Sequence, residues 1–259
     1  MITCIIQARM GSTRLPGKTM ERITKDKSVI DFVVEQLKFS KIIEKIIVAI
    51  PDSIEDDVTY NHLLSRKIQT YRGSLKNVLD RYYQCAKNAS SSVIVRVTAD
   101  CPLIDPEIVD KVITKFIKNK FDYVSNTHPR TFPYGTETEV FSFNALEKAW
   151  NETSNDFDRE HVTPFIKHKH SDTLVNIRHS EDLSNLRWTV DEQADLEVIR
   201  NVFKHFEPDI FFGWEDVLSL YKKKPELFHG NSSIKRNKGS FMSNGQKMWK
   251  RAKSVIPGG

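Results

Sequence analysis

Short apolar segments alternate with amphipathic ones through the first 125 residues, and this alternation limits the fold more than any other feature of the chain. Five segments rich in β-branched and aromatic residues are predicted strands: 2–7, 45–50, 68–71, 93–98 and 121–124. Four segments with helical periodicity lie between them: 28–39, 55–67, 75–88 and 106–118. Near-continuous apolar strands joined by helices are typical of a parallel sheet covered on both faces. The sequence therefore predicts an α/β fold with a doubly wound, mostly parallel sheet.

The pattern changes after residue 124. Residues 134–143 alternate like a strand, 145–150 and 159–168 have helical periodicity, and 185–191 have the composition of another strand. A helix is predicted over 193–206. We interpret this region as an inserted β/α subregion followed by a return to the sheet, so that residues 1–228 form one domain.

Composition excludes several classes of protein. The chain has 259 residues, 39% of them hydrophobic, which is enough to build a core. No segment approaches the roughly 18 consecutive apolar residues of a membrane helix, and residues 1–20 do not resemble a signal peptide. Three cysteines without a CxxC pair suit a reducing compartment. We therefore expect a cytoplasmic protein that is not bound to a membrane.

The net charge of +5 comes from the end of the chain. Seven lysines and arginines and no acidic residue follow His229, which leaves residues 1–228 with a net charge of −2. A mildly acidic body gives no support for a nucleic-acid surface. Residues 229–246 are polar, basic and rich in glycine and serine, and they are predicted to be a linker.

The segment "QARMGSTRLPGK", residues 7–18, follows the first predicted strand. Its glycines allow successive backbone N–H groups to face an anion, and Arg9, Arg14 and Lys18 add positive charge. This many donors fit a polyphosphate better than a single carboxylate. The segment is not a P-loop, because five residues rather than four separate Gly11 from Gly17. The alternative is a solvated turn.

Two aspartates stand where predicted strands end. Asp100 follows the strand 93–98, at the edge of the sheet where ligands bind, and it can hold Mg²⁺. A helix cap is better supplied by Asp105, because Pro106 follows it at the first helical position. Asp191 precedes the helix 193–206 and is either its cap or a second ligand.

Several spaced motifs resemble one family of enzymes. They are "QARMGSTRLPGK" (7–18), "YRGSLKNVLDRYY" (71–83), "VRVTADCPLIDP" (95–106), "PYGTETEVFS" (133–142), "REHVTPFI" (159–166) and "RWTVDEQADLEVI" (187–199). Together they resemble the cytidylyltransferases of the spore-coat polysaccharide biosynthesis protein F type. These enzymes are related to those that make CMP-activated 3-deoxy-manno-octulosonate and sialic acid. The resemblance implies a nucleotide-diphospho-sugar transferase fold of the glycosyltransferase-A-like kind. It also implies Mg²⁺-dependent transfer of CMP from CTP for surface polysaccharide or capsule biosynthesis.

The resemblance also implies roles for individual residues. It implies that Arg9, Arg14 and Lys18 are catalytic and that Asp100 and Asp191 bind Mg²⁺. Either Glu192 or Asp195 can share the metal with them. The nucleotide-binding residues it implies are Ala8, Arg9, Met10, Gly11, Ser12, Lys18, Arg72, Gly73, Thr98 and Ala99. The implied acceptor-binding residues are Arg96 and Glu139.

Both acceptor-binding residues have alternative interpretations. Arg96 lies in an apolar strand, where burial is costly without an anionic partner, so it either reaches the site or pairs with an internal carboxylate. Glu139 is equally well a solvent-facing strand residue.

The resemblance leaves the acceptor open between a phosphorylated small molecule and a sugar acid. No clear general base is found, which favours a phosphorylated acceptor because a phosphate is already anionic. A homodimer is expected by family analogy, with contacts in residues 130–180. The alternatives are a glycosyltransferase that uses a nucleotide sugar, a nucleotidyltransferase that uses another nucleoside triphosphate, and a non-catalytic regulatory module.

The last segment, "KMWKRAKSVIPGG" (247–259), resembles the beginning of glutamate-1-semialdehyde-type aminotransferases. It therefore predicts a truncated second domain. The alternative is a disordered basic tail.

Overall fold

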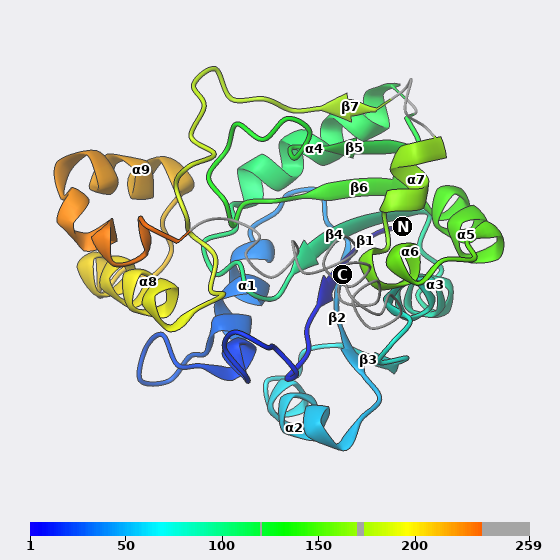
Figure 1. The fold of residues 1–259 in the computed structure, drawn as a ribbon, viewed down its shortest axis with the longest axis horizontal. Helices are drawn as coiled ribbons and strands as arrows, with labels where there is room; N and C mark the ends of the chain where they lie inside the picture. Colours follow the sequence, from blue (N-terminus) through cyan, green and yellow to red (C-terminus); the bar gives the residue numbers. More distant parts are fainter. Residues whose placement is uncertain (120, 170–173, 235–259) are drawn as a thin grey trace, which may run out of the picture.

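A seven-stranded sheet forms the centre of the computed structural model, which describes residues 1–119, 121–169 and 174–234 (Figure 1). The strands are β1 (Ile2–Gln7), β2 (Lys45–Pro51), β3 (Thr70–Gly73), β4 (Val93–Thr98), β5 (Tyr123–Ser125), β6 (Glu139–Ser142) and β7 (Val175–Asn176). The α-helices are α1 (Val29–Leu37), α2 (Asp57–Ser65), α3 (Val78–Asn88), α4 (Pro106–Asn119), α5 (Phe143–Glu152), α6 (Asp156–His161), α7 (Pro164–Lys169), α8 (Gln193–Phe206) and α9 (Trp214–Lys223). Short 3₁₀ helices are η1 (Lys18–Met20), η2 (Ile54–Asp56) and η4 (Pro225–Asn231).

The strand order is β3-β2-β1-β4-β6-β5-β7. Among the described strands β6 runs antiparallel to its neighbours and the other pairs are parallel, so the predicted fold class is confirmed. The order reverses direction between β1 and β4, where Gln7 pairs with Thr98. Ligands bind at such a reversal, beyond the carboxyl ends of the strands. The loops after β1 and β4 therefore open onto the same place, as predicted.

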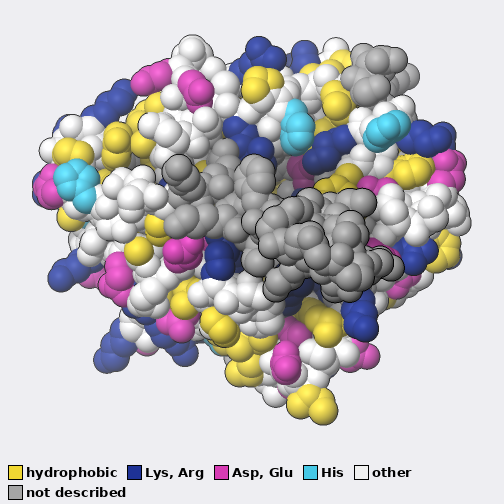
Figure 2. All heavy atoms as spheres, in the orientation of Figure 1, with side chains coloured by type: hydrophobic (Ala, Val, Ile, Leu, Met, Phe, Trp, Pro, Cys, Tyr) yellow, Lys and Arg dark blue, Asp and Glu magenta, His cyan; other side chains and the backbone are white. Residues whose placement is uncertain are grey.

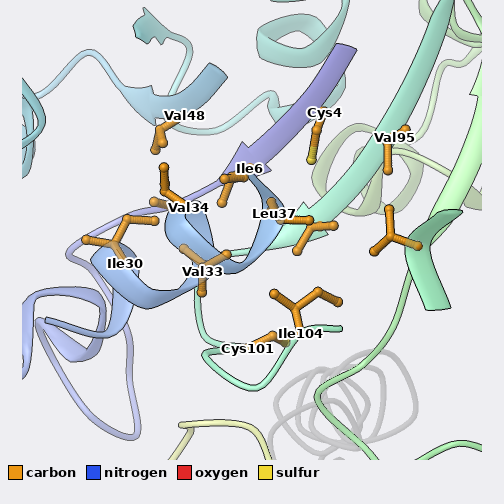
Figure 3. Close-up of a cluster of buried hydrophobic side chains, with 14 of the residues drawn as sticks. Cys4, Ile6, Ile30, Val33, Val34, Leu37, Val48, Val95, Cys101 and Ile104 are labelled. Atoms are coloured by element: carbon orange, nitrogen blue, oxygen red, sulfur yellow. The ribbon is translucent and has the colours of Figure 1, made fainter. Parts of the chain in front are cut away.

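Side chains that alternate along the strands build two core layers. On one face, α1 and α4 cover the sheet; Figure 3 shows Ile30, Val33, Val34 and Leu37 of α1 packed beside Cys4, Ile6 and Val48. On the other face, α3, α5 and α7 pack on Ile5 and its neighbours, and these helices gather at the right of Figure 1. A third apolar cluster joins α8 and α9 to the rest of the domain.

Two parts of the inserted region differ from the sequence prediction. The strand predicted over 134–143 is formed only at Glu139–Ser142, because the chain turns at Gly135, whose φ is 112°. The helix predicted over 159–168 is divided into α6 and α7 around Val162, whose φ is 70°. Pro164 follows Thr163 there, and a residue that precedes proline disfavours helical backbone angles.

The prediction that residues 185–191 form a strand that returns to the sheet is wrong. Within the described ranges this segment forms one isolated bridge, between Arg187 and Tyr134. Its backbone bonds go to loops: the Trp188 N–H donates to Tyr134 O at 2.7 Å and the Val190 N–H to Asp100 O at 2.8 Å. Trp188 and Val190 are buried in the third cluster instead, so the apolar alternation reflects packing under α8 and α9.

The boundary predicted at residue 228 lies inside η4. Asn231, within the predicted linker, is 3% exposed, and its side chain donates to Arg187 O and to Asp195 Oδ1 of α8. The domain therefore continues at least to Asn231. The remainder of the linker after residue 234 and the aminotransferase-like segment 247–259 lie outside the described residues.

Charged side chains of both signs are interspersed over the coloured part of the face in Figure 2. This mixed distribution matches the small net charge of residues 1–228. No helix in the described ranges is long and apolar enough to cross a membrane.

Candidate active site

The loop after β1 is folded back on itself by Met10. The Met10 carbonyl accepts hydrogen bonds from the Ser12 N–H at 2.8 Å and the Gly17 N–H at 3.0 Å. Gly17 has φ 71°, a left-handed conformation that favours glycine. A Cβ on Gly11 would meet nothing within 4 Å, so Gly11 is not needed for packing and the space above it is open.

Some N–H groups of this loop are used within the protein and others are not. The Met10 N–H donates to Asp56 Oδ1 at 2.8 Å, and the Leu15 N–H to Ser12 Oγ at 3.4 Å. The N–H groups of Gly11, Thr13 and Arg14 have no hydrogen bond within the described part of the chain. They can therefore donate to an anion, whereas the N–H groups of Met10, Ser12, Leu15, Gly17 and Lys18 are engaged within the protein.

Lys18 lies between the two predicted metal ligands. Its Nζ is 2.5 Å from Asp100 Oδ2 and 2.7 Å from Asp191 Oδ1. Burial alone lowers the pKa of Lys18, but the two carboxylates outweigh it and hold the pKa above its ordinary value. Burial likewise raises the pKa of Asp100, and the Lys18 ammonium reverses this effect and lowers it to about 2. Both partners are therefore charged at neutral pH.

Asp100 reaches this position because its loop is joined to the segment before α8. The Asp100 carbonyl accepts from the Val190 N–H at 2.8 Å and from Thr189 Oγ1 at 3.1 Å. Asp105 is the cap of α4, as predicted, since its Oδ1 accepts from the Glu107 and Ile108 N–H groups, each at 2.9 Å. The Asp100 side chain is thus left to face the site.

Both oxygens of the Asp191 carboxylate are bound by donors. Oδ1 accepts from Lys18 and lies 2.8 Å from Arg14 Nη2. Oδ2 accepts from the Tyr134 hydroxyl at 3.1 Å and from Arg187 Nη2 at 3.3 Å. Burial and the nearby Asp191 charge raise the pKa of Tyr134 well above its usual range, so the phenol stays a donor.

Behind Asp191, the buried Asp195 fixes the local backbone. Its Oδ2 accepts from the Asp191 N–H at 3.0 Å and the Glu192 N–H at 2.9 Å. Arg187 donates to both of its oxygens, at 2.7 and 2.8 Å, and Asn231 Nδ2 donates to Oδ1 at 2.9 Å. With these five donors and no exposed surface, Asp195 is a support for Asp191 rather than a metal ligand.

A second charged cluster surrounds Glu139. Its Oε2 is bound by Arg96 Nη1, and its Oε1 accepts from Tyr123 at 2.6 Å, Thr163 at 2.8 Å and Lys167 at 3.1 Å. Burial raises the pKa of Glu139, but the Arg96 and Lys167 charges outweigh it and hold the pKa well below its usual range.

The interpretation of Glu139 as a solvent-facing residue is wrong, because it is 6% exposed. Arg96 has the internal carboxylate partner that its strand position requires, and its Nη2 also donates to Gln7 Oε1 at 3.2 Å. Both Glu139 oxygens already accept hydrogen bonds within the protein. A ligand would therefore be bound by the cations of this cluster, Arg96 and Lys167.

The remaining predicted residues lie around these two clusters. Arg9 is exposed and has no ion pair within the described ranges. Arg72 is held by Asp52 and Asp57, with Nε–Oδ1 and Nη1–Oδ1 distances of 3.1 and 2.6 Å. Thr98 contacts Cys101 Sγ at 3.4 Å. The structure therefore joins Arg14, Lys18, Asp100 and Asp191 directly and leaves Arg72 in a separate group.

The two buried backbone positions of the prediction, Ala8 and Ala99, connect neighbouring strand ends. The Ala8 N–H donates to Ala49 O at 3.2 Å, and the Ala99 N–H donates to Gln7 O at 3.0 Å. Each alanine is 2% exposed, so only its backbone and methyl group can border a ligand.

The residues of these clusters that sequence reasoning missed include Tyr123, Tyr134, Thr163, Lys167, Arg187 and Asn231. Arg187 and Tyr134 belong to motifs that the sequence displays, and a buried arginine four residues before Asp191 is a usable signal. Asn231 and Lys167 give no such signal, because their partners are distant in the sequence.

No cluster of three or more His, Cys, Asp or Glu side chains suitable for a metal occurs among residues 1–119, 121–169 and 174–234. Asp100 and Asp191 provide two carboxylates that bind the same cationic nitrogen. Mg²⁺ is usually bound by one or two carboxylates together with water and substrate phosphates. The residues present therefore fit Mg²⁺ that arrives with a nucleotide.

A mostly parallel sheet with a cation-bearing glycine loop after β1 and a carboxylate after β4 is the arrangement expected of a nucleotidyltransferase. The family model described as cytidylyltransferase matches residues 3–209, so the chain belongs to the cytidylyltransferase family. It is a CTP-dependent nucleotidyltransferase.

Curated relatives and solved structures agree with this family. The spore coat polysaccharide biosynthesis protein SpsF of Bacillus subtilis is 29% identical over 87% of this chain and 95% of its own length. A 3-deoxy-manno-octulosonate cytidylyltransferase of Thermodesulfovibrio yellowstonii is 31% identical over 62% of this chain and 67% of its own. The solved structure of a cytidylyltransferase from Leptospira borgpetersenii is similar with a TM-score of 0.83 and 32% identity, and the match covers 88% of this chain and 96% of that chain.

Proposed function

We propose that this chain catalyses Mg²⁺-dependent transfer of CMP from CTP to an anionic acceptor, either a phosphorylated small molecule or a sugar acid, with release of pyrophosphate. The observation that carries the proposal is the convergence of Asp100 and Asp191 on Lys18, at the end of the loop whose free N–H groups suit a phosphate. In-line transfer at phosphorus uses cations that hold the phosphates and carboxylates that hold Mg²⁺, and this convergence brings candidates for both together beside the loop.

The residues of the site have separate tasks in this reaction. Arg9, Arg14 and Lys18 bind the triphosphate, together with the N–H groups of Gly11 and Thr13, and they stabilise charge as pyrophosphate leaves. Asp100 and Asp191 would hold Mg²⁺, which would supply positive charge to offset the charge of the triphosphate. Tyr134 and Arg187 orient Asp191 through its Oδ2. Catalysis of this kind consists of positioning and electrostatic stabilisation.

The cations around Glu139 support an anionic acceptor. Arg96 and Lys167 carry two positive charges against one carboxylate, and Arg96 bonds to Gln7 at the end of β1, beside the phosphate loop. A phosphate acceptor already carries an anionic nucleophilic oxygen, so transfer to it needs no general base. A sugar acid that reacts through a hydroxyl needs its proton removed by a base or by metal activation. Similarity to the Bacillus subtilis spore-coat protein supports a role in surface polysaccharide biosynthesis.

The proposal is tested with purified full-length chain, Mg²⁺ and each of four nucleoside triphosphates, measured by pyrophosphate release and by mass spectrometry of the products. Acceptors are offered in two sets, phosphorylated polyols or amino alcohols and free sugar acids, with the neutral dephosphorylated compounds as matched controls. We expect a CMP adduct with CTP and an anionic acceptor only, and activity that is lost with EDTA. Activity with a nucleotide sugar instead of CTP would contradict the proposal.

A further inference from the structure

A groove with a volume of about 740 Å³ lies between α4 and the loop that joins α1 to β2. Its α4 side extends from Pro106 to Lys118, which is about 18 Å along the helix axis. The loop contributes Phe39, Lys41 and Ile42 to the lining. None of these residues belongs to the candidate active site, so the groove is a separate feature of the molecule.

The groove has an apolar floor that is open to solvent. Phe39 is 53% exposed, and its ring packs on that of Phe211, which is 40% exposed, with the ring centroids 4.9 Å apart. Ile42 and Ile177 lie beside them in the lining and are half-buried. Two phenylalanines that meet at the surface leave apolar area in water, and a partner that covers this area would gain free energy. Apolar side chains gathered at a groove are typical of a binding surface.

Lysines that lack an acidic partner surround this floor. Four of them line the groove: Lys41, Lys111, Lys115 and Lys118. The lysine ion pairs in the described ranges are formed by other lysines of the chain. Glu107 and Asp110 also line the groove, but the Asp110 carboxylate already accepts from the Ser40 hydroxyl and, at 2.8 Å, from the Lys41 N–H. The groove therefore has a net positive charge, and three of its cations follow Asp110 along α4.

The sign of this charge disfavours an occupant from the chain itself. Residues 235–259 carry seven lysines and arginines and no acidic residue, so the lysines of the groove repel them. A second copy that presented the same groove across a two-fold axis would place lysine against lysine. A complementary partner must be acidic, and it must carry an apolar stripe that covers Phe39 and Ile42.

We propose that the groove along α4 is the docking site of an acidic amphipathic helix that belongs to another protein. A helix of about twelve residues matches the length of the groove. Its apolar stripe packs on Phe39 and Ile42, and its Asp and Glu side chains face Lys111 and Lys115. In helix-in-groove recognition the apolar anchors supply affinity, and the charges at the rim select the partner. The proposal is independent of the transfer of CMP, because the groove and the active site share no residue.

The experiment measures binding of labelled peptides to the full-length chain by fluorescence anisotropy. Three peptides of about fourteen residues share one stripe of Leu and Phe at helical spacing, and their remaining positions are Glu, Gln or Lys. The groove variants are Lys115→Glu and Phe39→Ser. Their matched controls are Lys148→Glu on α5 and Leu64→Ser on α2, which change exposed residues outside the groove. Thermal unfolding verifies that each variant is folded.

We expect the Glu peptide to bind with a Kd below about 1 mM and at least about tenfold more tightly than the Lys peptide, with weaker binding at high salt. Lys115→Glu and Phe39→Ser are each expected to weaken this binding at least about threefold, and the two controls are expected to leave it unchanged. A Glu peptide that does not bind, three peptides that bind equally, or groove variants that behave like their controls overturn the docking site.

An anionic membrane is the other surface that attracts lysines beside exposed apolar side chains. A lipid surface is contacted by protruding side chains rather than by a groove, so we expect no binding to vesicles of phosphatidylglycerol and phosphatidylcholine that depends on Phe39. Sedimentation with these vesicles is the check. Vesicle binding that both Lys115→Glu and Phe39→Ser abolish, without a preference for the Glu peptide, overturns the helix and assigns the groove to a membrane.

Discussion

The Lys18 ammonium donates to Asp191 Oδ1 at 2.7 Å, although 173 residues separate the two in the sequence. The same nitrogen lies 2.5 Å from Asp100. The phosphate loop and both candidate metal ligands therefore form one charged unit. A metal bound to these carboxylates competes with the ammonium, and an ammonium displaced from them is free to bind phosphate.

Lys18→Met is expected to tighten Mg²⁺ binding to the nucleotide-free protein, because no ammonium competes for the carboxylates. The same change is expected to lower kcat/KM for CTP at least about tenfold, since a charge-assisted phosphate contact is lost. Calorimetric Mg²⁺ titration and steady-state kinetics measure the two effects. Lys27→Met, which removes the ion pair with Glu35, is the control and leaves both unchanged. Weaker Mg²⁺ binding in Lys18→Met contradicts the competition.

Asp100→Asn and Asp105→Ala separate a ligand from a helix cap. Asp100→Asn is expected to abolish turnover, because it removes ligand charge but little volume, and to lower the unfolding free energy at pH 7 by about 2 kcal/mol through loss of the Lys18 pair. Asp105→Ala is expected to cost about 1–2 kcal/mol through loss of the cap, with kcat retained. Urea unfolding and pyrophosphate release measure the pair. Normal activity of Asp100→Asn with Mg²⁺ would remove the metal assignment.

Glu139 should make stability depend on acidic pH. Its folded pKa is lowered by Arg96 and Lys167, so its contribution is fully present above the unfolded pKa and is lost as pH falls through the lower folded value. Glu139→Gln is expected to lower the unfolding free energy by about 3–5 kcal/mol at pH 7, because it leaves a buried arginine unpaired. The variant is also expected to lose less unfolding free energy than the wild type as the pH falls below about 4.5. Urea unfolding from pH 7 to pH 3 measures both.

The control for that series is Glu197→Gln, which removes an exposed pair with Arg200. Its unfolding free energy should stay within about 0.5 kcal/mol of the wild type at every pH. A Glu139→Gln variant that behaves like this control would show that the buried cluster is not coupled to folding.

Asn231 connects the end of the described chain to the support of Asp191. It donates to Arg187 O at 3.0 Å and to Asp195 Oδ1 at 2.9 Å. Asn231→Ala, or truncation after residue 228, is expected to cost about 1–3 kcal/mol and to weaken Mg²⁺ binding, because buried acceptors lose their donor. Truncation after residue 234 is expected to retain CTP turnover. Thermal unfolding and Mg²⁺ titration of the three variants check this; equal behaviour of both truncations contradicts it.

The chain is expected to form a homodimer through residues 130–180. Exposed Phe157 on α6 lies in this region and is 47% exposed. Light scattering at micromolar concentration tests the assembly, and Phe157→Ser tests the location. A monomeric mass for the wild type counts against the dimer, and a dimeric mass for Phe157→Ser counts against this part of the surface.

Local patterns in the sequence indicated the strands β1 to β5, because alternation of apolar strands and amphipathic helices depends on neighbours within one element. The segments 2–7 and 93–98 coincide with β1 and β4. Turn chemistry identified the loop after β1, since Gly17 adopts the left-handed conformation that this loop needs. Asp105 was identified as a cap because proline follows it. Each of these inferences uses residues only a few positions apart.

The tertiary structure alone decided which distant groups meet. The segment 185–191 has the composition of a strand, but its buried face contacts α8 and α9 and its backbone bonds to loops. Asp195 was open as a metal ligand until Arg187 and Asn231 were seen to occupy it. The sequence did not indicate that Lys18 would lie between two carboxylates, and its contact with phosphate stays a prediction. Electrostatic pairing depends on distance in space, so a linear pattern identifies the charged residues but not their partners.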